Sequence, residues 1–334
     1  MIDGHGDDIY KYGQKITSNF SSNIFSKQDF PALREHLCSC LHLIYSYPEP
    51  DAHSLSSLLS KKYELNAKNI CTTNGATEAI YLIAQAYKGS QSSIIVPTFS
   101  EYEDACRIHS HKLSFIKELQ NIEPPTEMVW LCNPNNPTGF TYDIYYLKDI
   151  VKQYPDTLFV FDQSYGYFTN KKVWNIKEAA EYKNVILLHS MTKEYAVPGL
   201  RLGYITAHTD IVKQIEKFRI PWSVNALAIE AGKFLINNVT ELLDIKNYLA
   251  ETVRLQDKLK NIQGLKVFPT DTHFFLCKLE NRKAFELKEY LIDNYGILIR
   301  DASNFRGLDE SYFRIATQSP GENDLLVKAL QEWI

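Results

Sequence analysis

The sequence lacks any apolar run that approaches the ~20 residues a helix needs to cross a bilayer. Residues 1–8 are acidic and have neither the basic flank nor the apolar stretch of a signal peptide. Neither sign of charge dominates, since 36 Lys and Arg stand against 40 Asp and Glu, and no long block of one sign occurs. These absences argue against a membrane or nucleic-acid partner and predict a soluble, cytoplasmic protein.

Paired cysteines are also missing. The six cysteines are Cys38, Cys40, Cys71, Cys106, Cys132 and Cys277, with no C-x-x-C unit and no regular His/Cys spacing typical of zinc sites. We therefore expect reduced thiols and no metal site. No G-x-G-x-x-G follows a predicted strand, because residues 4–6 (GHG) come before any strand, and this disfavours a nicotinamide dehydrogenase.

From about residue 69 the sequence alternates short apolar runs with amphipathic stretches. The expected strands are residues 93–96, 128–132, 158–162, 185–189 and 202–206, and the expected helices are residues 78–87, 142–153 and 210–218. Strands that alternate with helices predict an α/β domain with a mostly parallel sheet.

After about residue 236 the pattern changes to that of a smaller α+β domain. Helices are expected at 241–259, 283–294 and 322–333, and strands at 266–269, 274–279, 297–300 and 312–316. Residues 1–40 hold no complete strand–helix unit, so we expect them to pack with this domain. The predicted division is a large domain of residues 41–236 and a small domain of residues 1–40 plus 237–334.

Turn-forming segments follow the predicted strands, and ligands of open α/β sheets bind at the carboxyl ends of strands. Residues 73–78 (TNGATE) lead into a helix whose first amides could hold a phosphate, although a plain turn is the commoner explanation. Residues 133–139 (NPNNPTG) fix a rigid turn that can aim an Asn side chain, or are only a tight turn.

Two further clusters carry ionisable groups. Asp162 ends an apolar strand, where its burial requires a cation or good donors unless it merely caps the next helix. A lysine is usually a solvated surface residue, but Lys193 lies between an apolar strand and a Pro-Gly turn, where burial would lower its pKa and favour attack on a carbonyl. Arg201, eight residues later, could hold a phosphate.

Together the four clusters resemble the fold type I pyridoxal-phosphate enzymes of the class I/II aminotransferase group, in order from Tyr47 to Arg314. The resemblance implies an α/β, aspartate-aminotransferase-like fold with a mostly parallel seven-stranded sheet, and pyridoxal 5'-phosphate as cofactor. It also implies that Lys193 binds the cofactor covalently and that Asp162 pairs with the protonated ring nitrogen. Tyr165 would help to hold the ring hydroxyl. Lys193, Asp162 and Tyr165 are therefore the expected catalytic residues.

The remaining cofactor contacts also follow from the resemblance. Asn136 would bind the ring hydroxyl, and Tyr102 would stack on the ring face. The phosphate would be held by Gly75, Ala76, Thr77, Ser190, Thr192 and Arg201. Tyr47 resembles the tyrosine that reaches this phosphate from the other subunit, which implies a homodimer.

The substrate contacts implied by the resemblance include two arginines. Arg314 resembles the arginine that grips the substrate carboxylate, and Arg300 resembles a second anion-binding position, so the substrate would be a small molecule with two anionic ends. Residues 221–228 (PWSVNALA) and 297–309 resemble the threonine-phosphate decarboxylases of cobalamin biosynthesis. Residues 4–6 resemble their amino-terminal His-Gly-Gly motif, which would put His5 near the substrate phosphate.

Asn23 and Asn136 are the other expected substrate contacts. Two departures from the decarboxylase pattern stand out: Asp7 replaces the usual Gly, and residues 19–24 (NFSSNI) lack the proline that normally follows. Either could alter the choice of substrate.

We predict decarboxylation of L-threonine O-3-phosphate, with a histidinol-phosphate-type aminotransferase as the alternative. The two reactions differ in which bond of the α-carbon stands perpendicular to the cofactor ring, and the sequence leaves both open. A non-catalytic cofactor-binding protein is disfavoured, because it could have lost Arg300 and Arg314, and both are present.

Overall fold

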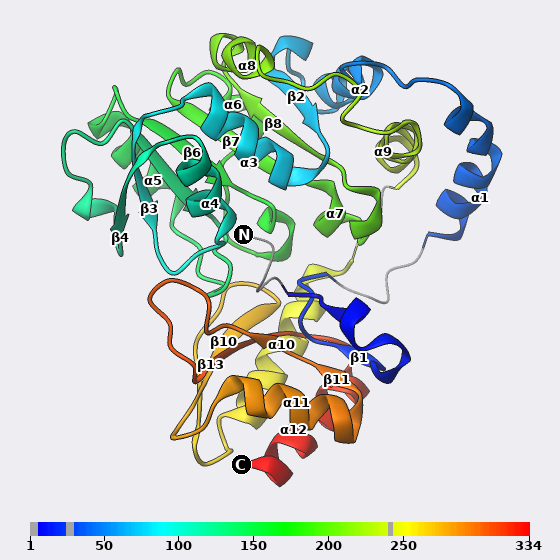
Figure 1. Cartoon of the computed structure of the whole chain (residues 1–334), viewed down its shortest axis with the longest axis vertical. Coiled ribbons are helices and arrows are strands. Elements are labelled where there is room, and N and C mark those ends of the chain that lie inside the picture. Colours follow the sequence, from blue (N-terminus) through cyan, green and yellow to red (C-terminus); the bar gives the residue numbers. More distant parts are fainter. Residues whose placement is uncertain (1–5, 25–29, 240–242) are drawn as a thin grey trace.

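The computed structural model describes residues 6–24, 30–239 and 243–334. Figure 1 shows one large sheet with its helices in the upper part of the view and a smaller sheet with its helices below. The large sheet has seven strands in the spatial order β2 (Ile70–Thr73), β8 (Gly203–Ala207), β7 (Val185–Ser190), β6 (Leu158–Asp162), β5 (Met128–Cys132), β3 (Gln91–Ile95) and β4 (Lys112–Ile116). Only β8 runs antiparallel to its neighbours, so the predicted mostly parallel seven-stranded sheet is confirmed.

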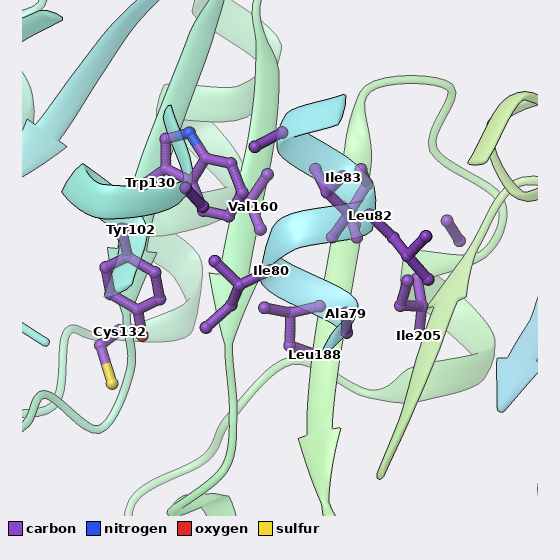
Figure 2. Packing of buried hydrophobic residues seen from close by; sticks show 14 of the residues in the cluster. Ala79, Ile80, Leu82, Ile83, Tyr102, Trp130, Cys132, Val160, Leu188 and Ile205 are labelled. Carbon is purple, nitrogen blue, oxygen red and sulfur yellow. The ribbon is translucent and has the colours of Figure 1, made fainter. Parts of the chain in front are cut away.

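Alternating residues of the central strands pack against helices on both faces of the sheet. Trp130, Val160 and Leu188 face α3 (Gly75–Ala86), as Figure 2 shows, in a cluster that also includes residues of α4 (Glu101–Ile108) and α8 (Thr209–Glu216). The intervening residues, such as Leu131 and Phe161, pack with α5 (Ile144–Gln153) and α6 (Ile176–Ala179). Burial on both faces explains why these strands are continuously apolar in sequence.

The smaller sheet is antiparallel, with the order β12 (Arg300–Asp301), β13 (Tyr312–Ala316), β10 (Phe274–Leu279) and β9 (Leu265–Val267). It packs with α10 (Ile245–Leu259), α11 (Ala284–Tyr295) and α12 (Pro320–Trp333) around a second core. The predicted strand at 297–300 is divided, because β11 (Ile297–Leu298) pairs instead with β1 (Ser18–Asn19).

The chain before β2 contributes to both parts. β1 pairs with β11, and Phe20, which follows it, packs in the core of the smaller sheet, whereas Leu33 of α1 (Pro31–Ser39) packs with residues of α2 (His53–Lys62) and α9 (Ala226–Asn238). The predicted division into residues 41–236 and residues 1–40 plus 237–334 stays a prediction, and the packing of Leu33 favours a boundary ahead of α1. Among the described residues, no helix combines the length and apolar character that would let it cross a membrane.

Candidate active site

A cavity of about 220 Å³ lies at the carboxyl ends of β5, β6 and β7, where residues 21–23 and the strands β12 and β13 approach the large sheet. The predicted site residues that line it are Asn23, Ala76, Thr77, Tyr102, Asn136, Asp162, Tyr165, Ser190, Thr192, Lys193, Arg201, Arg300 and Arg314. Gly75 lies beside the cavity without lining it, and Tyr47 is 86% exposed and away from it. His5 lies outside the described residues.

Lys193 lies in the short helix α7 (Met191–Glu194), which directly follows β7. Desolvation of its amine lowers the pKa to about 8, and the positive charges of Arg314 and Arg201 act in the same direction. The carboxylates of Asp7 and Asp162 oppose this shift. Near neutral pH an appreciable fraction of this amine is therefore unprotonated and able to attack a carbonyl.

Asp162 is the last residue of β6 and is buried. Its carboxylate accepts hydrogen bonds from the Tyr102 hydroxyl at 2.7 Å and from the backbone N–H of Ser164 at 2.8 Å. Burial raises its pKa, while Ser164, Tyr102 and the charge of Lys193 oppose the rise. The bond from Ser164 is a local turn and not the helix cap of the alternative explanation, because the N-cap of the next helix, Gly166–Phe168, is Tyr165. The carboxylate also lines the cavity, where a cation would favour its charged form.

Groups suited to bind a phosphate converge at the amino end of α3. Arg201 has a left-handed backbone (φ +53°), and a Cβ built on Gly75 would lie 2.7 Å from its Nη2 atom. The hydroxyls of Ser190 and Thr192, which also line the cavity, lie 2.7 Å apart. Helix N-terminal amides, an arginine and two hydroxyls could together hold an anion, and glycine at position 75 leaves room for the Arg201 side chain.

Two buried arginines from β12 and β13 also line the cavity. Arg314 donates to the side-chain oxygen of Asn136 and to the backbone carbonyl of Ser21, and its Nε has no partner among the described residues. Arg300 donates to the Asn304 side-chain oxygen at 2.8 Å and to the backbone carbonyl of Asp301 at 2.6 Å. Burial lowers the pKa of Arg314 to about 9 and that of Arg300 to about 10, so an anion bound between them would relieve the cost of burying both charges.

Other predicted contacts are positioned by the turns after the strands. Tyr165 is buried, and burial raises the pKa of its hydroxyl to about 12, so it stays protonated and can donate a hydrogen bond. Tyr102 is buried against Trp130, with ring centroids 5.7 Å apart. Both polar atoms of the Asn23 side chain are buried and make no hydrogen bond of good geometry among the described residues, although the side chain is near enough to the Tyr165 hydroxyl to oppose the rise of its pKa.

Several lining residues were not predicted as site residues: Gly6, Asp7, Ser21, Ser22, Ile80, Phe99, Ser100, Cys132, Ser164, Asn304 and Phe305. Asn304 lies in the segment 297–309 that the sequence comparison singled out, and its role as the acceptor for Arg300 could have been inferred from that segment. Ser21 contributes a backbone carbonyl, for which a sequence offers no signal.

Comparison with known proteins agrees with this geometry. Residues 15–330 match the family model of aminotransferase class I and II. The chain is 42% identical to the L-threonine-O-3-phosphate decarboxylase of Porphyromonas gingivalis, with a TM-score of 0.92 over 95% of this chain and 99% of that one.

Two relatives carry different names. An adenosylcobalamin biosynthesis bifunctional protein of Leptospira interrogans is 31% identical over 97% of this chain, and the chain spans only 40% of that relative's length. A histidinol-phosphate aminotransferase of Thermoanaerobacter sp. (strain X514) is 33% identical over 86% of this chain and 84% of that protein.

The residues of this cavity fit pyridoxal phosphate, the cofactor of this family. The amides that begin α3, together with Arg201, Ser190 and Thr192, suit its phosphate, and the amine of Lys193, with a pKa lowered to about 8, suits its aldehyde. The buried carboxylate of Asp162 suits its ring nitrogen. The chain therefore belongs to the class I and II aminotransferase family and is a pyridoxal-phosphate-dependent enzyme.

Proposed function

We propose that this enzyme decarboxylates L-threonine O-3-phosphate. The observation that carries the proposal is the pair formed by Arg300 and Arg314, which are direct cross-strand partners on β12 and β13 and line the same cavity as Lys193. Like charges directly opposite each other destabilise a sheet, and burial adds to the cost. A substrate with both a carboxylate and a phosphate would neutralise the pair.

We assign the cofactor contacts as the family resemblance implies. Lys193 holds the aldehyde, Tyr165 and Asn136 hold the ring hydroxyl, and Tyr102 covers one face of the ring. Gly75 leaves room for the phosphate, which is held by Ala76, Thr77, Ser190, Thr192 and Arg201.

The bound cofactor supplies an electron sink for the negative charge that develops at the substrate α-carbon. Asp162 would keep the ring nitrogen of a bound cofactor protonated, because a carboxylate about 4 Å from a cation contributes about 4 kcal/mol at an effective dielectric near 20. Arg314 holds the substrate carboxylate, and Arg300, with Asn23 and His5, holds its phosphate. Lys193 is the group that delivers a proton to the α-carbon once carbon dioxide has left.

The geometry of the carboxylate decides between decarboxylation and amino transfer. Arg314 and its partner Asn136 would set which bond of the substrate α-carbon is exposed to cleavage, the bond to the carboxylate in a decarboxylase or the bond to hydrogen in an aminotransferase. The 42% identity to a decarboxylase over nearly the whole chain favours cleavage of the bond to the carboxylate.

A paired assay tests this proposal. Purified holoenzyme should release carbon dioxide and form aminopropanol phosphate from O-phosphothreonine without any added keto acid. The decarboxylase proposal fails if glutamate converts the cofactor to its amine form and histidinol phosphate supports turnover. If the enzyme is a decarboxylase, we expect it to act in cobalamin biosynthesis, the pathway that appears in the name of the Leptospira relative.

We further propose that the enzyme is a homodimer in which Tyr47 reaches the partner's cofactor phosphate. Tyr47 is exposed, and its ring lies 5.3 Å from that of Trp222. Other exposed apolar side chains are Leu41, Ile44, Tyr45 and Ile220. A second copy would cover these side chains, and a role for Tyr47 in the other site fits its absence from the lining of its own cavity.

A cytoplasmic location completes the proposal. All six cysteines are free, and Cys71, Cys106, Cys132 and Cys277 are buried thiols. Reduced thiols are typical of a reducing compartment. Fractionation of the native host cell would test this location.

A further inference from the structure

Three side chains with metal-binding atoms meet where the end of α1 packs against α9, away from the cavity. They are His36, Cys40 and Glu230, and within residues 6–24, 30–239 and 243–334 they form the one group of this kind. The Cys40 sulfur lies 3.7 Å from His36 Nε2, which lies 3.8 Å from Glu230 Oε2. All three atoms lie within 4.8 Å of one another.

The local fold brings these atoms together. His36 and Cys40 are four residues apart at the end of α1, so their side chains lie on one face of the helix. The N–H of Cys40 donates to the His36 carbonyl at 3.1 Å, which keeps the last turn helical. Glu230 belongs to α9, which α1 contacts through the apolar cluster that contains Leu33 and Ile229.

The spacing is close to that of a tetrahedral zinc site. Zinc binds sulfur at about 2.3 Å and nitrogen or oxygen at about 2.0–2.2 Å, so at tetrahedral angles its ligand atoms lie roughly 3.4–3.6 Å apart. The distances from His36 Nε2 to the Cys40 sulfur and to Glu230 Oε2, 3.7 and 3.8 Å, exceed this range by a few tenths of an ångström, and the third pair lies within 4.8 Å. Changes of side-chain rotamer would bring the three atoms to ligand distance.

Neighbouring groups already orient two of the three ligands. The His36 ring stacks on Phe234 with centroids 5.0 Å apart. Lys233 binds Oε1 of Glu230 at 2.6 Å, which leaves Oε2 directed toward His36. Partners that fix a ligand's orientation are a regular feature of metal sites. The side chains of His36 and Glu230 are 30% and 21% exposed, so an ion can reach them from solvent.

We propose that His36, Cys40 and Glu230 bind one zinc ion, or a divalent transition ion of similar preference, with the fourth position open to water. The sulfur and imidazole ligands exclude Ca²⁺ and Mg²⁺, which prefer oxygen. The Cys40 thiol gives up its proton to solvent when the ion binds, so thiolate and carboxylate balance the two positive charges. The proposal is independent of the reaction assigned to the cavity.

The site has a structural consequence for the surface that carries Tyr47. Cys40 directly precedes the 3-10 helix Leu41–Tyr45, and Trp222, which contacts Tyr47, lies just ahead of α9. A bound ion would link the end of α1, through His36 and Cys40, to α9, through Glu230. Zinc should therefore stabilise the segment between α1 and Tyr47.

Calorimetric titration of the chelator-treated, full-length holoenzyme with Zn²⁺ tests the proposal. We expect one equivalent to bind, and Co²⁺ to give a thiolate-to-metal absorption band. His36→Gln, Cys40→Ser and Glu230→Gln should each weaken binding by about tenfold or more, since even loss of an outer partner costs about 10–100-fold. Cys38→Ser is the matched control, because Cys38 is an exposed thiol on the same helix but two residues away. It should bind Zn²⁺ like the wild type.

Two results would overturn the proposal: wild-type enzyme that binds Zn²⁺ no more tightly than Cys40→Ser, or loss of binding in Cys38→Ser. The melting temperature distinguishes a lost ligand from a misfolded variant. Without Zn²⁺ the variants should melt like the wild type, and added Zn²⁺ should raise the melting temperature of the wild type and of Cys38→Ser by more than that of the three ligand variants.

Discussion

The two roles proposed for Lys193, capture of the cofactor aldehyde and delivery of a proton to the α-carbon, both depend on the lowered pKa of its amine. Burial is the main cause, and Arg314 and Arg201 add to it. The folded protein therefore disfavours the charged amine, so apoenzyme stability from this group rises with pH between about 8 and 10.5. The same shift makes the neutral nucleophile available under mildly alkaline conditions.

We predict that the rate at which apoenzyme captures pyridoxal phosphate rises about tenfold per pH unit below pH 8 and levels off above it. Stopped-flow absorbance would measure the rate, and borohydride reduction should place the label on the peptide with Lys193. N-acetyl-lysine in the same buffers is the control, and its rate should keep rising toward pH 10.5, the ordinary pKa of the amine. A flat profile for the enzyme, or label on another lysine, would contradict the assignment.

Asp7 is the residue at which this chain departs from the decarboxylase pattern within the cavity itself. Its φ of +62° is left-handed, a conformation that favours glycine, and Asn19 donates to its carboxylate at 2.6 Å. Its negative charge raises the pKa of both Lys193 and Arg314. The carboxylate of Asp7 therefore disfavours the binding of an anionic substrate, while it stabilises the protonated forms of Lys193 and Arg314.

We predict that Asp7→Gly lowers the KM for O-phosphothreonine about fivefold, because a charge 4 Å from an anion costs about 1 kcal/mol even in water. Asp7→Asn is the matched variant, since it removes the charge and keeps a side chain with a left-handed backbone. Steady-state kinetics should give a similar KM for both variants, while only Asp7→Gly should gain thermal stability. An unchanged KM in both would show that the carboxylate does not act on the substrate.

At the scale of elements, the connection from β2 to α3 decides whether a phosphate can bind. Gly75 begins α3 with φ +81°, and Arg201 passes directly over it. Gly203, at the start of β8, also lets two backbones meet, because its Cβ would lie 2.7 Å from the Ala76 nitrogen. Close backbone approach, rather than side-chain chemistry, builds this end of the cavity.

We predict that Gly75→Ala loses cofactor during gel filtration and is destabilised by about 1–3 kcal/mol, because the methyl group displaces Arg201 and strains the backbone. Gly199→Ala is the control: it lies two residues before Arg201, and its Cβ would meet nothing within 4 Å. Cofactor content per subunit and chemical denaturation measure both effects. Equal retention of cofactor by the two variants would remove Gly75 from the phosphate site.

The strands of the large sheet that are buried on both of their faces were predictable from their apolar runs. β5 and β6 have the predicted bounds, whereas β2 and β4 were missed. β4 is an edge strand with exposed and half-buried residues, and β2 buries two threonines, so neither has the strong apolar pattern of a central strand.

The candidate site was predictable where residues follow strands in a fixed order, as Asp162 and Lys193 do. Contacts that depend on distant segments were not. Ser21 approaches Arg314 across 293 residues, and Glu230 approaches His36 only because α1 packs on α9. No local pattern encodes such pairs, because they arise from tertiary packing of segments with no shared periodicity.

For the whole molecule, the open question is whether one subunit completes the site of another. Tyr47 is exposed and does not line its own cavity, so a role for it in catalysis requires a second copy. Two inactive variants can separate the possibilities. Tyr47→Ala keeps Lys193, and Lys193→Ala keeps Tyr47, so each homodimer has two defective sites.

When the two variants are mixed, unfolded and refolded together, half of the dimers should be hybrids. In a hybrid, one site combines Lys193 of one subunit with Tyr47 of the other, while the second site carries both defects. We therefore predict that the mixture regains about a quarter of wild-type decarboxylase activity. If Tyr47 serves its own subunit, every site keeps at least one defect and no activity returns. Sedimentation velocity on the same samples checks that dimers form, so a lack of recovery cannot be attributed to failed assembly.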